Sequence, residues 1–91
     1  MSEPSWRVEL APAAQRQLRK LPPDATARAR GPILALALDP RPTGARPLAG
    51  SSFRRLRAGD LRIVHAIDDA ARTVVILRVV RRNESTYRRV R

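Results

Sequence analysis

Five arginines gather at and beyond the ends of short apolar runs in the second half of the chain: Arg55, Arg57, Arg62, Arg81 and Arg82. The packing of a β-sheet explains the valines, isoleucines and leucines around them, but it gives no reason for so many cations. Arginine carries a planar, permanently charged guanidinium group that binds a phosphate through two parallel hydrogen bonds. The spacing therefore predicts a platform for an anionic partner, and phosphate is the group that such a platform would hold.

The overall charge of the chain favours the same class of partner. The 91 residues include 19 Lys and Arg but only 8 Asp and Glu, which gives a formal net charge of +11. This excess indicates binding to nucleic acid or to an acidic protein. The chain has no cysteine, which excludes disulfides and thiolate chemistry. It also shows no long apolar run and no signal peptide, so we expect a cytoplasmic protein without a membrane partner.

The first half of the chain predicts one strand and two helices. Residues 6–10 alternate as W-R-V-E-L, which is typical of a strand, and residues 11–21 have apolar side chains at helical spacing. A second helix is predicted over residues 24–38, with Asp24 as its N-cap. Gly31-Pro32 lies inside this helix and predicts a kink or a later start. The apolar face of the second helix is predicted to contain Ile33, Leu34, Ala37 and Leu38.

The second half predicts a loop followed by strands. Residues 39–52 are rich in Pro, Gly and Ser and are predicted to form the loop. Three β-type runs joined by short turns then occupy residues 53–57, 61–67 and 73–81, and residues 85–91 form a short C-terminal segment. The predicted fold class is α+β in one domain, residues 1–91. Two helices pack on one face of a small twisted, mainly antiparallel, four-stranded sheet. The other face is left to carry arginines.

The order of short motifs resembles the RelE/ParE superfamily of bacterial toxins from type II toxin-antitoxin systems. The resemblance covers Trp6 to Tyr87 and rests on R-K-L-P, L-D-P-R-P, P-L-A-G, R-L-R-x-G-D-x-R-I-V, and V-x-R-R followed by Y-R. It implies a small basic toxin that a cognate acidic antitoxin holds inactive in a hetero-oligomer. In the RelE branch the toxin enters the ribosome and cuts mRNA without a metal, whereas the ParE branch poisons DNA gyrase.

The resemblance also implies site residues at the positions that match the RelE-like pattern. The matching residues are Arg55 with Arg57 beside it, Arg62, Arg82 or Arg81, and Tyr87. The flanking arginines complete a predicted RNA-binding set of Arg54, Arg55, Arg57, Arg88 and Arg89. ParE-like chains usually lack the full set, so its presence favours the RelE branch. His65 departs from the pattern, because the family commonly has tyrosine there.

RNA cleavage is chemically reasonable with these residues alone. RNA supplies its own nucleophile, the 2′-hydroxyl group, so the protein must provide orientation, proton transfer and positive charge around the transition state. We assign Arg62 and Arg82 to that charge, with Arg81 replacing Arg82 if the match shifts by one residue. Tyr87 is assigned to proton transfer or to stacking on a base. This chemistry requires no cofactor and no metal ion.

Structural interpretations of the same residues stay open. Arg62 and Arg82 could be solvated strand ends, and Tyr87 could close the edge of the core. His65 is interpreted as a sheet residue in preference to a proton shuttle, and Trp6 and Phe53 as core residues. The acids at positions 60, 68 and 69 fit hairpin turns better than a metal site.

The predicted function is therefore that of a RelE-like toxin, a ribosome-dependent mRNA endoribonuclease that inhibits translation. Two alternatives remain: a ParE-like inhibitor of DNA gyrase, and a non-catalytic basic RNA-binding protein or decayed toxin.

Overall fold

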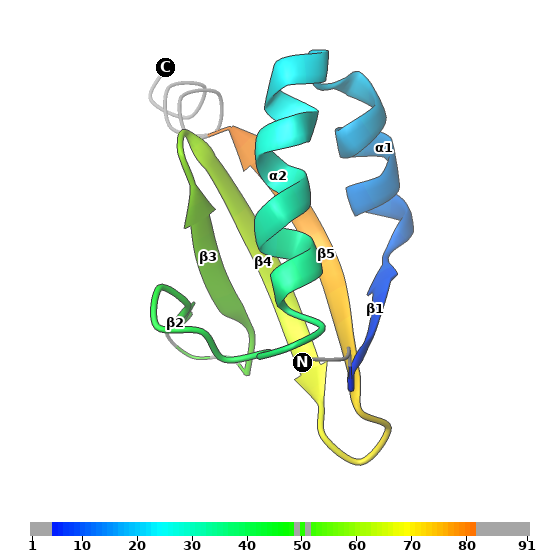
Figure 1. Ribbon diagram of the computed structural model, residues 1–91, viewed down its shortest axis with the longest axis vertical. Helices are drawn as coiled ribbons and strands as arrows, with labels where there is room; N and C mark the ends of the chain where they lie inside the picture. The colour runs from blue at the N-terminus through cyan, green and yellow to red at the C-terminus, as the bar shows by residue number, and fades with distance from the viewer. Residues whose placement is uncertain (1–4, 49, 51, 82–91) are drawn as a thin grey trace.

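The computed structural model describes residues 5–48, 50 and 52–81 of the chain. Its elements are β1 (Arg7–Leu10), α1 (Pro12–Lys20), α2 (Pro23–Ala35), β2 (Arg46–Pro47), β3 (Arg54–Ala58), β4 (Leu61–Asp68) and β5 (Thr73–Arg81). The strands form one sheet in the order β1-β5-β4-β3-β2. β1 runs parallel to β5, and the other neighbouring strands are antiparallel. Both helices cover the same face of the sheet (Figure 1).

The predicted layering is confirmed, but the predicted number of strands is wrong. The sheet has a fifth strand, β2, inside the stretch that we expected to be a loop throughout. β2 has only two residues, Arg46 and Pro47, which pair with Arg55 and Arg54. Two residues cannot show a periodic pattern, so the sequence contained no sign of this strand. The segment predicted over residues 85–91 lies outside the described residues.

Prolines mark where both helices begin and where α1 ends. Pro12 and Pro23 each lie in a first helical turn, where the missing amide hydrogen has no helical partner to lose. α1 ends at Lys20, just before Leu21-Pro22. α2 continues through Pro32 to Ala35, so the predicted late start is wrong.

The N-terminus of α2 also differs from the prediction. Pro22 is the N-cap, and no side chain bonds to the free amides there. Asp24 instead lies in the first turn, where its negative charge still favours the positive end of the helix dipole. The helix therefore begins two residues earlier than an N-cap at Asp24 would require.

The core lies between the helices and the sheet. Small helix residues, Ala14, Ala25 and Ala29, are fully buried and allow the helices to approach the strands closely. On α2 the buried line continues to Ile33. The predicted apolar face was partly wrong, because the side chain surface of Leu34 is 57% exposed. Leu38 is also exposed, so two large apolar residues of this region are not buried in the core.

The two predicted aromatic core residues have different surroundings. Trp6 packs against the core, as expected, and the Arg72 guanidinium lies 4.7 Å from the centre of its ring. Phe53 is exposed, so its assignment to the core was wrong. Within the described residues, no helix is long and apolar enough to cross a membrane.

A bulge in β5 decides which of its side chains face the helices. His65 of β4 pairs with Ile76, whereas the preceding Val64 pairs with Arg78, so Leu77 has no partner of its own. Such an extra residue inverts the alternation of side chains beyond it. As a result, Val79 is buried in the core and Arg78 is exposed.

Candidate nucleic-acid interface

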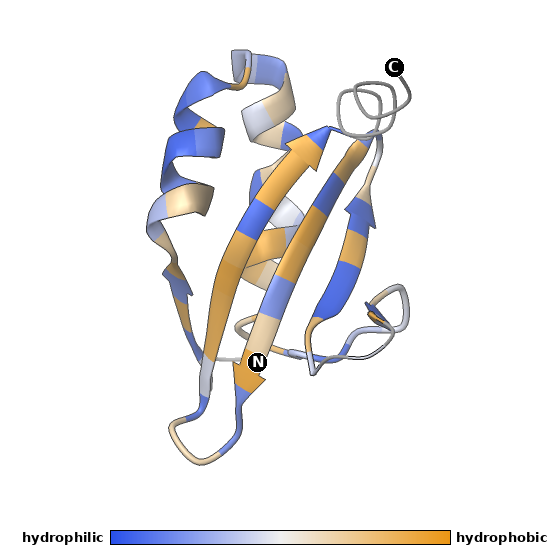
Figure 2. Cartoon of the chain, turned by 180° about the vertical axis from the view of Figure 1, so that it is seen from behind, coloured by the Kyte–Doolittle hydropathy of each residue, from blue (hydrophilic) through white to orange (hydrophobic). Residues whose placement is uncertain are grey.

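Figure 2 views the sheet from the side that the helices leave uncovered, and hydrophilic segments interrupt the apolar runs of its strands. On the central strand β4, Leu61, Ile63 and His65 are buried beneath the helices, so Arg62 faces the opposite side. Residues directly opposite each other on neighbouring strands share a face. Arg57 lies opposite Arg62. We call this side the open face.

The register places further arginines on the open face. Arg55 lies opposite Val64, which also lies opposite Arg78. On the other side of β3, Arg46 lies opposite Arg55. The group, which we call the open-face arginines, consists of Arg46, Arg55, Arg57, Arg62 and Arg78. These residues come from four adjacent strands, β2 to β5, so the sheet positions them as one surface.

Four of the five open-face arginines differ from Arg28 and Arg41 in their surroundings. Arg28 and Arg41 each form an ion pair with a carboxylate, at 2.9 Å in both cases. In the part of the chain that the structure describes, no ion pair involves Arg46, Arg55, Arg57 or Arg78. Their positive charge is therefore not neutralised by an acidic neighbour among these residues, and it is available to an external anion.

A polar cleft indents the edge of this surface. It has a volume of about 360 Å³ and is lined by Thr43, Gly44, Arg46, Arg55 and Arg57. Three of its lining side chains are guanidinium groups, and the rest of the wall comes from the turn before β2. The cleft can therefore hold one or more phosphate groups.

Two arginines that were predicted as site residues lie on the covered side. Arg54 is opposite the buried His65, and Arg81 is opposite the buried Leu61. Arg81 Nε lies 3.9 Å from Asp60 Oδ2. The same carboxylate accepts a hydrogen bond from Arg28 Nη2 of α2 at 2.9 Å. The structure thus separates Arg81 from Arg62 by the thickness of the sheet.

The predicted site is only partly within the described residues. The structure brings together Arg55, Arg57 and Arg62 of the predicted set. The remaining predicted residues, Arg82, Tyr87, Arg88 and Arg89, lie outside the described residues. Sequence reasoning missed two members of the surface, Arg46 and Arg78, and singled out neither. Arg46 gave no usable signal, because β2 is too short for a pattern.

His65 is confirmed as a sheet residue of the covered face. Its side chain is fully buried, and its Nε2 donates a hydrogen bond to the Pro40 carbonyl oxygen at 3.1 Å. Burial lowers the pKa of His65, with a smaller contribution from the nearby positive charge of Arg54. The lowered pKa favours the neutral imidazole, which lies on the opposite side of the sheet from the open-face arginines.

The acids at the hairpin turns stabilise those turns. Asp69 binds Arg41 through two hydrogen bonds, at 2.9 and 3.2 Å, and Asp68 Oδ1 accepts a hydrogen bond from the Ala71 amide. The Arg41 guanidinium lowers the pKa of Asp69, and Arg28 lowers that of Asp60. Among residues 5–48, 50 and 52–81, no three His, Asp or Glu side chains gather as metal ligands.

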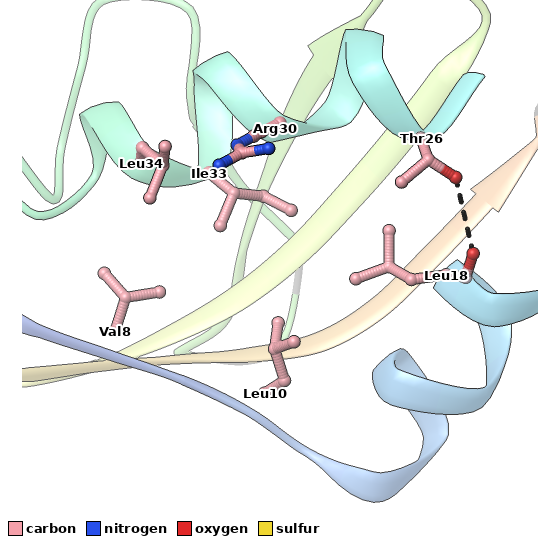
Figure 3. A pocket seen from close by; sticks show the side chains of 7 residues that line it. All are labelled: Val8, Leu10, Leu18, Thr26, Arg30, Ile33 and Leu34. Carbon is pink, nitrogen blue, oxygen red and sulfur yellow. Dashed lines mark hydrogen bonds between the residues drawn. The ribbon is translucent and has the colours of Figure 1, made fainter. Parts of the chain in front are cut away.

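An apolar groove lies on the helix side of the molecule. It has a volume of about 300 Å³ and is lined by Val8, Leu10, Leu18, Thr26, Arg30, Ile33 and Leu34. Figure 3 shows these side chains converging from β1 and the two helices, with Thr26 Oγ1 donating to the Leu18 carbonyl oxygen across the helix pair. The groove therefore has an apolar floor and one cation, Arg30, on its wall.

Comparisons with known proteins identify the family. Residues 8–86 match the model of the ParE toxin of the type II toxin-antitoxin system parDE. No curated protein matches the sequence.

Solved structures of toxins share the fold. A chain of the archaeal RelE-RelB complex from Pyrococcus horikoshii OT3 has a TM-score of 0.75 at 23% identity, over 86% of this chain and 96% of that one. A chain of the toxin-antitoxin complex RelBE2 from Mycobacterium tuberculosis has a TM-score of 0.68 at 29% identity, over 90% and 98%. The isolated E. coli RelE toxin has a TM-score of 0.74 at 17% identity, over 94% and 99%. The chain belongs to the ParE toxin family of type II toxin-antitoxin systems, within the RelE/ParE superfamily, and it has a RelE-like fold.

Proposed function

We propose that this toxin is a ribosome-dependent, metal-independent mRNA endoribonuclease that inhibits translation in the cytoplasm. The observation that carries the proposal is the open face, where Arg55, Arg57 and Arg62 lie together and no carboxylate pairs with the first two among the described residues. Phosphoryl transfer within RNA needs concentrated positive charge more than it needs a protein nucleophile. Such a surface supplies that charge.

The roles follow from position on the sheet. Arg62 lies on the central strand, flanked by Arg57 on one side and Val80 on the other, and we assign it to the charge of the transition state. Arg55 and Arg57 lie on the neighbouring strand β3, and we assign them to binding the phosphate backbone next to the reacting bond. Arg81 receives no such role, because it lies on the covered side beside Asp60. We retain Arg82 and Tyr87 as catalytic candidates, and Arg88 and Arg89 as RNA-binding candidates, on the resemblance alone.

A gyrase inhibitor is the second candidate function. The observation that favours it is the family match itself, because the matching model is that of ParE toxins. In that case the open face would bind a protein or nucleic-acid surface of the gyrase complex without cleaving RNA. The presence of Arg55, Arg57 and Arg62 on one surface supports the nuclease instead.

An acidic antitoxin is the proposed partner in the cell. The structures from P. horikoshii and M. tuberculosis are toxin-antitoxin complexes, which supports a hetero-oligomer for this chain as well. The apolar groove offers a surface for the apolar side of an amphipathic helix, and the net charge of +11 favours an acidic partner.

The test is primer extension on a defined mRNA incubated with the purified toxin, with and without programmed ribosomes. We expect discrete cuts at the codon in the ribosomal A site, and only when ribosomes are present. The parallel assay measures supercoiling by DNA gyrase with the same toxin preparation. Intact mRNA together with inhibited gyrase would replace the proposed function with the ParE-like one.

A further inference from the structure

We propose that the cleft lined by Thr43, Gly44, Arg46, Arg55 and Arg57 is a separate subsite for the phosphate backbone of single-stranded RNA, beyond the reacting bond at Arg62. The inference rests on the proposed function, because it identifies the RNA strand as the ligand. It adds two elements that the sequence did not single out, the turn at residues 43–44 and the short strand β2.

The geometry of the cleft is that of a phosphate site. Arg46 and Arg55 lie opposite each other on β2 and β3, and Arg57 is two residues further along the same face of β3. All three arginines line the 360 Å³ cleft. Thr43 and Gly44 complete its lining, and both are exposed to solvent. A hydroxyl group, an exposed stretch of backbone and three guanidinium groups can all donate hydrogen bonds to phosphate oxygens.

The arrangement is unfavourable without a ligand. Like charges directly opposite each other on neighbouring strands destabilise a sheet. Arg46 with Arg55 is such a pair, and Arg57 with Arg62 is a second. In the described part of the chain, no carboxylate offsets the first pair. A bound polyanion would remove this repulsion, so the cleft gains stability when RNA is present.

The subsite lies at one side of the sheet rather than at its centre. Arg62 is on β4, while Arg46 is two strands away on β2, and neighbouring strands are separated by about 4.8 Å. An RNA strand that passes the reacting phosphate at Arg62 would therefore place a flanking phosphate in the cleft. Contacts to phosphate position a strand without reading its sequence. The cleft is thus expected to set the register of the strand and to have little base preference.

The experiment measures binding separately from cleavage. The probe is a fluorescent single-stranded RNA oligonucleotide with 2′-O-methyl groups in place of the 2′-hydroxyl groups, which removes the nucleophile. Fluorescence anisotropy gives its affinity for the toxin over a range of salt concentrations. The variants are Arg46→Ala, Arg46→Lys and the control Arg16→Ala. Arg16 is exposed on α1, on the other side of the sheet, and its replacement removes the same charge.

The expected result separates Arg46 from Arg16. Loss of one charge-assisted phosphate contact weakens binding by about tenfold and lowers the salt slope by about 0.7. Arg46→Lys keeps the charge and the salt slope but loses part of the affinity, because a point charge replaces the planar fork. The Arg16 variant binds as the original chain does. Thermal unfolding of each variant verifies that the fold is retained.

Failure of the cleft and failure of the proposed function give different results. If Arg46→Ala and Arg16→Ala bind and cleave equally well, the subsite is disproved, and ribosome-dependent cleavage still stands. If Arg46→Ala binds RNA weakly but the original chain cuts no mRNA on ribosomes, the subsite stands and the proposed endoribonuclease does not.

Discussion

The two faces of this sheet are built from alternate residues of the same strands, yet they differ in chemistry. On β4, Ile63 and His65 are fully buried under the helices. Arg62 lies between these residues and the start of the same strand, and its side chain is on the face away from the helices. Arg28 of α2 and Arg41 of the following loop have carboxylate partners. The open-face arginines Arg46, Arg55, Arg57 and Arg78 have none in the described part of the chain.

The comparison teaches that arginine content alone says little about function. The chain has 19 basic residues, and among the described ones Arg7, Arg28, Arg41 and Arg81 have a carboxylate within 4 Å. An arginine with a carboxylate partner stabilises a turn or joins two elements. An arginine without one, placed opposite another arginine on a sheet, adds repulsion and so indicates a ligand. We therefore expect substitutions on the covered face to change stability, and substitutions on the open face to change function.

The largest effect on stability is expected at His65. His65→Ala removes a fully buried side chain and leaves the Pro40 carbonyl oxygen without its donor. We expect the free energy of unfolding to fall by about 2–4 kcal/mol. Chemical denaturation measures it, with the half-buried Val64→Ala on the open face as the control. A loss at Val64 as large as that at His65 would break the proposed difference between the faces.

The pH dependence of stability tests the same residue. Burial lowers the pKa of His65 in the folded chain, so the unfolded chain binds the additional proton first as the pH falls. Stability should therefore decrease below pH about 6.5, with a limiting slope of about 1.4 kcal/mol per pH unit. His65→Gln, which can still donate to Pro40, should lack this slope. An equal slope in both proteins would assign the titration to another group.

A smaller effect is expected at the ion pairs of the rim. Asp60→Asn removes the charge that pairs with Arg28 and approaches Arg81. The pairs are exposed, so the loss of stability should be smaller than at His65 and should shrink as salt is added. Thermal unfolding at low and high salt measures this difference. A salt-independent loss would indicate a packing role for Asp60 instead of an electrostatic one.

The smallest effect, and the only gain, is expected on the open face. Arg57→Ala removes a cation that lies opposite Arg62, so the free energy of unfolding should rise by about 0.5 kcal/mol. Arg41→Ala, which removes the same charge but breaks an ion pair with Asp69, should lower stability. Denaturant titration of both variants tests the contrast. A loss of stability at Arg57 would mean that the open face contributes to the fold.

Sequence reasoning recovered the layers of the fold because they depend on long patterns. The helices and the three long strands carry hydrophobic periodicities over many residues, and short turns join the strands as antiparallel hairpins. β2 was missed because a strand of two residues has no period. The continuation of α2 through Pro32 was missed because tertiary packing outweighed the local cost of proline.

The candidate site was only half predictable because of the bulge in β5. With strict alternation from Val74 and Ile76, Arg78 would face the helices and Arg81 would face away from them. The unpaired Leu77 reverses both, so Arg78 joins the open face and Arg81 lies beside Asp60. A shift of one residue in pairing has no signature in a run of valines, isoleucines and leucines. Arg62 faces away from the helices, as simple alternation along β4 predicts, because the bulge begins only beyond Val64.

Ribosome-dependent cleavage by two single variants tests the central claim most directly. Arg62→Ala removes a central open-face arginine, and Arg41→Ala removes an exposed arginine that is paired with Asp69. We expect Arg62→Ala to lower the rate of mRNA cleavage by a factor of about 10²–10³, since it removes a donor to the charged transition state. Arg41→Ala should cleave at the original rate. Full activity in Arg62→Ala, or an equal loss in both variants, would contradict the division of labour between the two faces.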